Sequence, residues 1–298
     1  MPGYETTNSC EVIDLKSPTS TCKSIPNLPM KVADAIGGLG FQENPIICGG
    51  WQNKTFDKNC FSLENNNWVS TDSMNAVRGF SAATQLQDGR LLVTGGLDDY
   101  SHFINSAELL TESGWKSKVA SLPFTIGAHC MVTINSTTVM VIGGTQNGQN
   151  SANTFYLNIE RQSWTEGPPL KTTRYAHSCG RIRKDQNSQE LSIIVAAGTN
   201  DDSPLLSSVE VLDEGSKEWQ TGPELPFGIK YAKIVEDPSG GVVLIGGYYS
   251  AHQYLDTLFQ LAHGGKDAEW TETEQKLKIE KSYHTAFLVP DNIVDCCT

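Results

Sequence analysis

Short apolar runs, separated by turn residues, recur along the whole chain, and they predict a protein built from strands. The most regular runs are each followed by a glycine pair or a close variant, and these pairs lie 46, 48, 54 and 49 residues apart. The runs are Pro45–Cys48, Leu91–Thr94, Val139–Ile142, Ile193–Ala196 and Val242–Ile245, followed by Gly49-Gly50, Gly95-Gly96, Gly143-Gly144, Ala197-Gly198 and Gly246-Gly247.

A tryptophan follows each of these pairs in the same phase, and a second strand-like run lies between the pair and the tryptophan. We therefore expect units of four short strands, A to D, in which the glycine pair ends strand B and the tryptophan opens strand D. The tryptophans are Trp68, Trp115, Trp164, Trp219 and Trp270, and the intervening runs are Cys60–Leu63, Ala107–Leu110, Asn153–Leu157, Val209–Leu212 and Leu255–Leu261.

This pattern resembles the kelch repeat, whose period is about 50 residues. The segment Asp88–Gly96 is close to the kelch consensus, and the resemblance extends over essentially the whole chain. It implies an all-β, kelch-like β-propeller with four antiparallel strands per blade. The alternative of a β-sandwich with surface glycines gives no reason for the period.

The two ends of the chain predict how such a ring closes. Cys10–Ile13 reads as a strand C, with Cys22 in the tryptophan position, whereas His284–Val289 reads as strand A and Asn292–Asp295 as strand B. We therefore expect a sixth blade that combines strands from both ends, so that residues 1–298 form one domain. The expected blades are residues 37–74, 75–121, 122–171, 172–223, 224–275, and 276–298 together with 10–29.

The cysteines suggest two bridges between strands B and C of a blade. Cys48 and Cys60 occupy neighbouring antiparallel positions, and Cys10 with Cys296 repeats that placement in the closing blade, with Cys297 as the alternative to Cys296. Buried free thiols would explain the same residues. We interpret Cys130 and Cys179, which are one position out of register, as core thiols.

Composition and charge limit the classes of partner and the location that we expect for the protein. The formal net charge of −12 argues against nucleic acid as the main partner, and no apolar run is long enough to span a membrane. We expect a monomer. Sequons at Asn53 and Asn135, with the paired cysteines, favour an extracellular location over a cytoplasmic one, although no signal segment is visible.

Three histidines share one repeat position at the start of strand A, namely His129, His177 and His284, where other units hold Ser81 and Lys233. Residues on separate blades are spread around a ring, so we expect no metal, no cofactor and no catalytic residue. The alternative is a carbohydrate-active or metal-dependent kelch enzyme, resembling sugar isomerases or galactose oxidase.

The resemblance implies that the B–C and D–A loops emerge on one face, and these loops carry aromatic residues and arginines, which are common at binding hot spots. We expect this face to bind a protein partner, and Asp98-Asp99 and Asp201-Asp202 favour one that is basic or polar. Packing at the loop bases is the alternative, above all for the arginines. The candidate residues are Trp51, Phe56, Arg78, Phe80, Tyr100, Phe103, Phe124, Arg174, Tyr175, Tyr231, Tyr248, Tyr249 and Tyr283.

Overall fold

The computed structural model describes residues 6–16, 21–98, 102–250, 253–290, 293 and 296–297. Within these ranges every regular element is a β-strand, as the sequence predicts, and no helix there could cross a membrane. The chain divides into two compact units, which are described separately. Unit 1 comprises Met1–Gly127 and Phe287–Thr298, and unit 2 comprises Ala128–Ala286.

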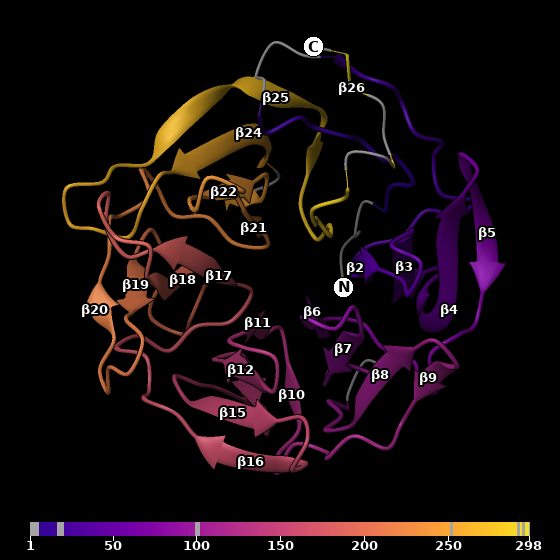
Figure 1. The fold of residues 1–298 in the computed structure, drawn as a ribbon, viewed down its shortest axis with the longest axis horizontal. Coiled ribbons are helices and arrows are strands. Elements are labelled where there is room, and N and C mark those ends of the chain that lie inside the picture. The colour runs from indigo at the N-terminus through magenta and orange to yellow at the C-terminus, as the bar shows by residue number, and fades with distance from the viewer. Residues whose placement is uncertain are drawn as a thin grey trace. The chain divides into compact units, whose positions relative to one another are not determined.

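Unit 1 contains two antiparallel sheets of four strands, each in sequence order (Figure 1). A short strand from each end of the chain forms a further two-stranded pair, β1 with β26. The strands are β1 (Thr21–Cys22), β2 (Ile36–Leu39), β3 (Pro45–Gln52), β4 (Thr55–Glu64), β5 (Asn67–Thr71), β6 (Ala82–Gln85), β7 (Leu91–Thr94), β8 (Ala107–Thr111), β9 (Gly114–Lys116), β10 (Ile126–Gly127) and β26 (Cys296–Cys297).

Unit 2 contains three sheets in which four strands again follow in order, with β23 added at one end of β24. The first strands of the three sheets are neighbours, since β17 contacts both β11 and β21. The strands are β11 (Cys130–Thr133), β12 (Thr138–Ile142), β13 (Thr145–Gln146), β14 (Gln149–Asn150), β15 (Thr154–Asn158), β16 (Ser163–Glu166), β17 (Ser178–Arg183), β18 (Leu191–Ala196), β19 (Val209–Leu212), β20 (Gln220–Thr221), β21 (Lys233–Glu236), β22 (Val242–Ile245), β23 (Tyr248–Ser250), β24 (Gln253–Leu261) and β25 (Thr271–Lys281).

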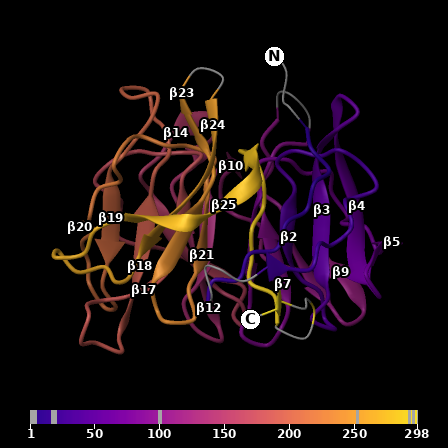
Figure 2. The same ribbon diagram turned by 90° about the horizontal axis from the view of Figure 1, so that it is seen from above.

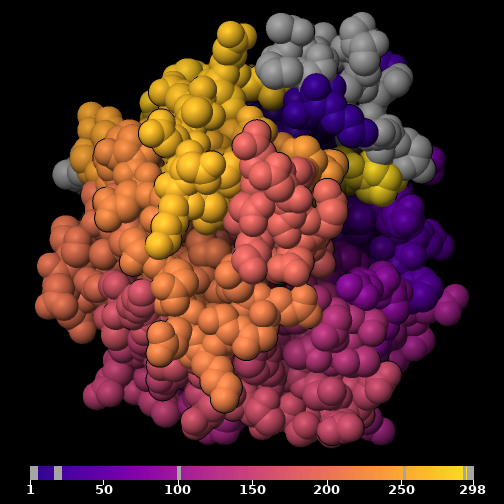
Figure 3. Space-filling model, turned by 60° about the vertical axis from the view of Figure 1, so that its left-hand side comes forward, coloured from indigo at the N-terminus to yellow at the C-terminus, as the bar shows by residue number. Residues whose placement is uncertain are grey.

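The second strands of the sheets are deeply buried over the segments just before the glycine pairs, which explains why the sequence shows continuous apolar runs there. Both faces of β7 and β22 are buried, so alternate positions are equally apolar. The outermost strand has the opposite character. In β25, visible in yellow on the surface in Figure 3, charged side chains predominate and most positions are exposed.

The tryptophans connect each sheet to the segment that precedes it. In four repeats the indole Nε1–H donates to a backbone carbonyl of the preceding repeat, at 2.8–3.1 Å. A tryptophan therefore fills apolar space while its single polar group is satisfied. The pairs are Trp68 with Pro26, Trp115 with Asp72, Trp219 with Pro168, and Trp270 with Pro223. Trp164, in the remaining repeat, is only half-buried.

The second residue of each glycine pair makes one repeated hydrogen bond. Its N–H donates, at 2.7–2.8 Å, to the carbonyl of a residue near the start of the following repeat. The donor–acceptor pairs are Gly50–Arg78, Gly96–Ile126, Gly144–Arg174, Gly198–Ile229 and Gly247–Lys281. The period of about 50 residues therefore reflects a repeated junction as well as a repeated sheet.

The chain ends differ from the prediction. Cys10–Ile13 and His284–Val289 form no strand, whereas Thr21–Cys22 does, in the register Cys22 opposite Cys296. Asn292–Asp295 lies almost entirely outside the described residues. The two ends thus pair through β1, which is shorter than the expected strand Cys10–Ile13 and lies later in the chain. Cys22, and not Cys10, lies opposite Cys296.

Candidate functional site

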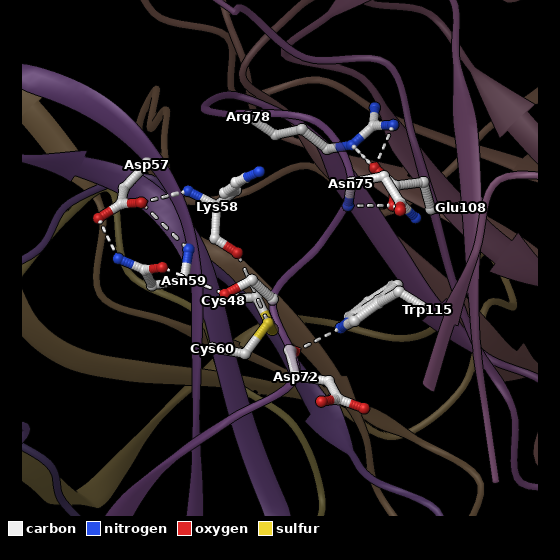
Figure 4. Close-up of a disulfide and its surroundings, with 11 residues drawn as sticks. Cys48, Asp57, Lys58, Asn59, Cys60, Asp72, Asn75, Arg78, Glu108 and Trp115 are labelled. Carbon is white, nitrogen blue, oxygen red and sulfur yellow. Dashed lines mark hydrogen bonds and ion pairs between the residues drawn. A yellow bond between two sulfur atoms is a disulfide. The ribbon is translucent and has the colours of Figure 1, made fainter. Parts of the chain in front are cut away.

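Two arginines predicted at the binding face form buried ion pairs instead. The side chain of Arg78 is fully buried, and its guanidinium lies 2.9 Å from Glu108 (Figure 4). The guanidinium also donates to the carbonyls of Gly95 and Ser106. Burial favours a higher pKa for Glu108, but hydrogen bonds from Asn75 and Ala76 and the charge of Arg78 lower it overall.

Arg174 repeats this arrangement in unit 2. Its guanidinium lies 2.9 Å from Glu210 and donates to the carbonyls of Ala197 and Ser208. Burial lowers the pKa of both arginines, although each glutamate opposes that shift. We therefore place Arg78 and Arg174 in the framework, because both side chains are fully buried and ion-paired.

The two glutamates were missed in the sequence although a signal was present. Glu108 and Glu210 occupy equivalent positions on β8 and β19, each two residues after a serine. The repeats that carry isoleucine in place of the arginine, at Ile126 and Ile229, carry phenylalanine in place of the glutamate, at Phe155 and Phe259. The residue types at the two positions change together, as expected for direct contact.

Aromatic residues in unit 1 pack at the bases of loops. Trp51 is 9% exposed, and its ring meets that of Phe56 edge-on at 5.1 Å. Phe56 in turn lies against Gly79, where an added Cβ would be 2.1 Å from the ring, and Phe103 covers Gly127 in the same way, at 2.3 Å. Trp51 therefore belongs to the core, and Phe103 is only partly exposed.

The other aromatic candidates are partly exposed, and most of them lie in unit 2. They are Phe80, Phe124, Tyr175, Tyr231, Tyr248, Tyr249 and Tyr283; Tyr100 lies outside the described residues. In unit 2, β14 and β23 reach the same end of the sheets (Figure 2), so the B–C loops that they belong to share that end.

Four tyrosines and one lysine form a continuous row at this end of unit 2. Tyr231 stacks on Tyr283 with ring centroids 3.9 Å apart, and the rings of Tyr248 and Tyr254 are 5.8 Å apart. The ammonium of Lys230 connects the two pairs, since it lies 5.8 Å from the ring centroid of Tyr231 and 5.2 Å from that of Tyr248. We call these five residues the tyrosine row.

The repeated histidines pack against glycine. His177 is 4% exposed, and a Cβ added to Gly143 would lie 2.8 Å from its ring; the same contact recurs between His284 and Gly246, at 3.1 Å. Burial, followed by the charge of Lys233, lowers the pKa of His284 to about 3. Burial, followed by the charge of Arg174, lowers that of His177 well below 6.5.

The backbone conformation shows that one residue was assigned wrongly to this repeat position. The residue before it has a positive φ in every repeat, and in the fifth sheet that residue is Tyr231, so Ala232 rather than Lys233 occupies the position. Among the described residues, no group of three or more histidine, cysteine or acidic side chains is arranged to hold a metal ion.

The disulfides confirm one prediction and correct two. Cys48 and Cys60 are bridged, as predicted. Cys130 and Cys179 are bridged as well, not core thiols, because β11 and β17 are neighbours and the Cα atoms lie 6.0 Å apart despite the shift in register. Cys10 forms no disulfide and its thiol donates to the Asn8 carbonyl, whereas Cys22 is disulfide-bonded. The side chain of Cys296 lies outside the described residues.

Both sequons lie in exposed turns. Asn53 lies between β3 and β4, and Asn135 between β11 and β12. The side-chain oxygen of Asn135 accepts hydrogen bonds from the backbone N–H of Thr137, at 3.0 Å, and from its hydroxyl, at 3.2 Å.

Comparisons with known proteins support the fold alone. No family model and no curated protein sequence matches the chain. A solved structure of YjhT superposes with a TM-score of 0.70 and 14% sequence identity, over 84% of this chain and 86% of that one. The four-stranded antiparallel sheets of both units are compatible with a propeller-like fold.

Proposed function

We propose that the chain is a six-bladed, kelch-like β-propeller that binds a protein partner through its B–C and D–A loops. The tyrosine row supports this proposal most directly, because partly exposed tyrosines gather at a loop end. Tyrosine is enriched at the centres of protein interfaces, where its ring supplies contact area at little cost in side-chain entropy.

The contact surface in this proposal is narrower than the set of candidates from the sequence. It keeps the partly exposed Tyr175, Tyr231, Tyr248, Tyr249 and Tyr283, all in unit 2. The partly exposed Phe80, Phe103 and Phe124 remain separate candidates within unit 1. It leaves out Trp51, Arg78 and Arg174, which are buried.

We also propose that the protein is a secreted glycoprotein and a monomer with no catalytic role. Two disulfides among the described residues are typical of an oxidising compartment. Asn53 and Asn135 are exposed, as a modified asparagine must be.

Affinity capture with two baits tests the binding proposal. Wild type and Tyr248→Ala/Tyr249→Ala, both purified from an oxidising compartment, are compared on the same extracellular extract. We expect a partner on the wild type that the variant loses while it stays folded; its melting temperature should fall only through the lost contacts of Tyr249 with Phe227 and the apolar cluster. Equal capture by both folded baits would exclude this surface.

A further inference from the structure

The backbone holds the tyrosine row in place. Lys230 and Tyr248 exchange two backbone hydrogen bonds, at 3.0 and 2.8 Å, and Tyr248 lies directly opposite Tyr254 in the β23–β24 ladder. Three segments distant in sequence therefore present these side chains together. Because the segments are paired through their backbones, a ligand would meet a preformed surface.

The fold does not require these side chains. Tyr231 and Tyr283 have φ angles of 57° and 55°, and the equivalent positions in two other repeats hold Ala128 and Ala176 at 51° and 54°. A bulky residue is uncommon at positive φ, and alanine fulfils the backbone role elsewhere in the chain. In unit 1 the equivalent residue is Phe80, at 52°, whose ring lies 6.0 Å from that of Phe56. The backbone conformation therefore does not call for the tyrosine rings, which stack on each other instead of on a loop residue such as Phe56.

Lys230 also departs from the repeat. Its position holds Gly79 and Gly127 in unit 1, where the missing side chain makes room for the rings of Phe56 and Phe103. In unit 2 the position holds Tyr175, Lys230 and Ser282, and of these Lys230 reaches over the tyrosine rings. At this one repeat a cation between two partly exposed ring pairs thus takes the place of the packed aromatic base seen in unit 1.

The charge of Lys230 is not neutralised within the described chain. No carboxylate there forms an ion pair with it, and burial alone lowers its pKa. In a protein with a net charge of −12, a half-buried lysine without an acidic neighbour is conspicuous. A ligand carboxylate would form an ion pair with Lys230, and the partial exclusion of water at this position would strengthen that pair.

We propose that the tyrosine row binds an acidic peptide segment of the partner, with an Asp or Glu carboxylate on Lys230 and a flat apolar side chain, proline or aromatic, on the Tyr231–Tyr283 pair. This inference rests on the proposed function and specifies its partner. It differs from the expectation of a basic or polar partner, because the charged side chain in the row is that of Lys230.

An apolar neighbour favours a peptide over a saccharide. Phe227 is 38% exposed, and its ring lies 5.4 Å from that of Tyr249 and 5.7 Å from that of Phe259. Tyr249 follows Tyr248 in β23, and its ring contacts both the Phe227 ring and the buried apolar cluster of unit 2. An aliphatic or aromatic side chain gains more from such a surface than a hydroxylated ring does.

Selection from a displayed library of random 12-residue peptides tests the proposal. We expect wild type to enrich peptides in which Asp or Glu lies within a few positions of proline or an aromatic residue. Lys230→Gln should bind the best of these peptides at least about tenfold more weakly, and Tyr231→Ala/Tyr283→Ala should do the same. Lys217→Gln, which removes an exposed lysine elsewhere in unit 2, should bind as wild type does, and all melting temperatures should agree.

Three outcomes would overturn the proposal: no enrichment on wild type, equal binding by Lys230→Gln, or binding of the row to acidic saccharides on an array but to no peptide. Affinity capture distinguishes a failure of the acidic-segment proposal from a failure of the proposed function. A captured partner that is lost with Tyr248→Ala/Tyr249→Ala but unaffected by Lys230→Gln would leave protein binding intact and remove only the acidic segment.

Discussion

Cys130 and Cys179 join the first strands of two successive sheets, β11 and β17, so that a covalent bond accompanies the contact between those sheets. Cys48 and Cys60, in contrast, join neighbouring strands of one sheet. The two bridges enclose 49 and 12 residues respectively, which leads to different expected contributions to stability.

Removing the bridge between sheets should destabilise the protein more than removing the bridge within a sheet. On the chain-entropy model the longer loop contributes about 4 kcal/mol and the shorter about 3 kcal/mol. Urea unfolding of Cys130→Ala/Cys179→Ala and Cys48→Ala/Cys60→Ala measures both losses. A larger loss for the second variant would show that local packing, and not loop closure, determines the order.

Arg174→Ala should cost about 3–5 kcal/mol, because the carboxylate of Glu210 would remain buried without its cation. Arg181→Ala is the matched control. Its pair with Glu236 is about one-third exposed, so a loss of at most about 1 kcal/mol is expected. Equal losses in chemical denaturation would argue against a framework role for the buried arginine.

Acidification should destabilise the fold through its buried histidines. The pKa of His284 is lowered to about 3, so between pH 6.5 and 3 the unfolded chain takes up a proton that the folded chain does not. Stability should fall with pH in this window by up to about 1.4 kcal/mol per pH unit for this residue. His284→Gln should show a shallower pH dependence of the unfolding free energy than wild type does; identical slopes in the two proteins would refute this account.

Trp219→Ala should cost about 3–5 kcal/mol, since this side chain is 1% exposed and also donates to the Pro168 carbonyl. Trp164→Ala should cost clearly less, because Trp164 is only half-buried. Thermal unfolding of both variants gives the comparison. A smaller loss at Trp219 would mean that the tryptophan does not stabilise the junction between repeats.

The periodic features could be predicted from the sequence because they arise from local patterns. The runs that end in glycine pairs became β3, β7, β12, β18 and β22, with bounds close to those expected. The Cys48–Cys60 bridge followed from strand register within one sheet.

Features that depend on contacts between sheets could not be predicted. Cys130 and Cys179 differ in repeat register, so only the proximity of β11 and β17 reveals their bridge. Whether an aromatic loop residue packs or remains exposed depends on its neighbour: glycine makes room for Phe56 and Phe103, whereas lysine stands beside Tyr248. The sequence supplied the right residue types for the site but not their division between framework and surface.

The most direct test of the account is the affinity of the captured partner for wild type and for Tyr231→Ala/Tyr283→Ala, measured by titration calorimetry alongside the melting temperatures. Alanine is native to the equivalent positions 128 and 176, so the variant should fold and melt as wild type does. We predict a dissociation constant at least about tenfold higher with an unchanged melting temperature. An unchanged dissociation constant with a lowered melting temperature would contradict the account, because the tyrosines would then stabilise the fold and not the complex.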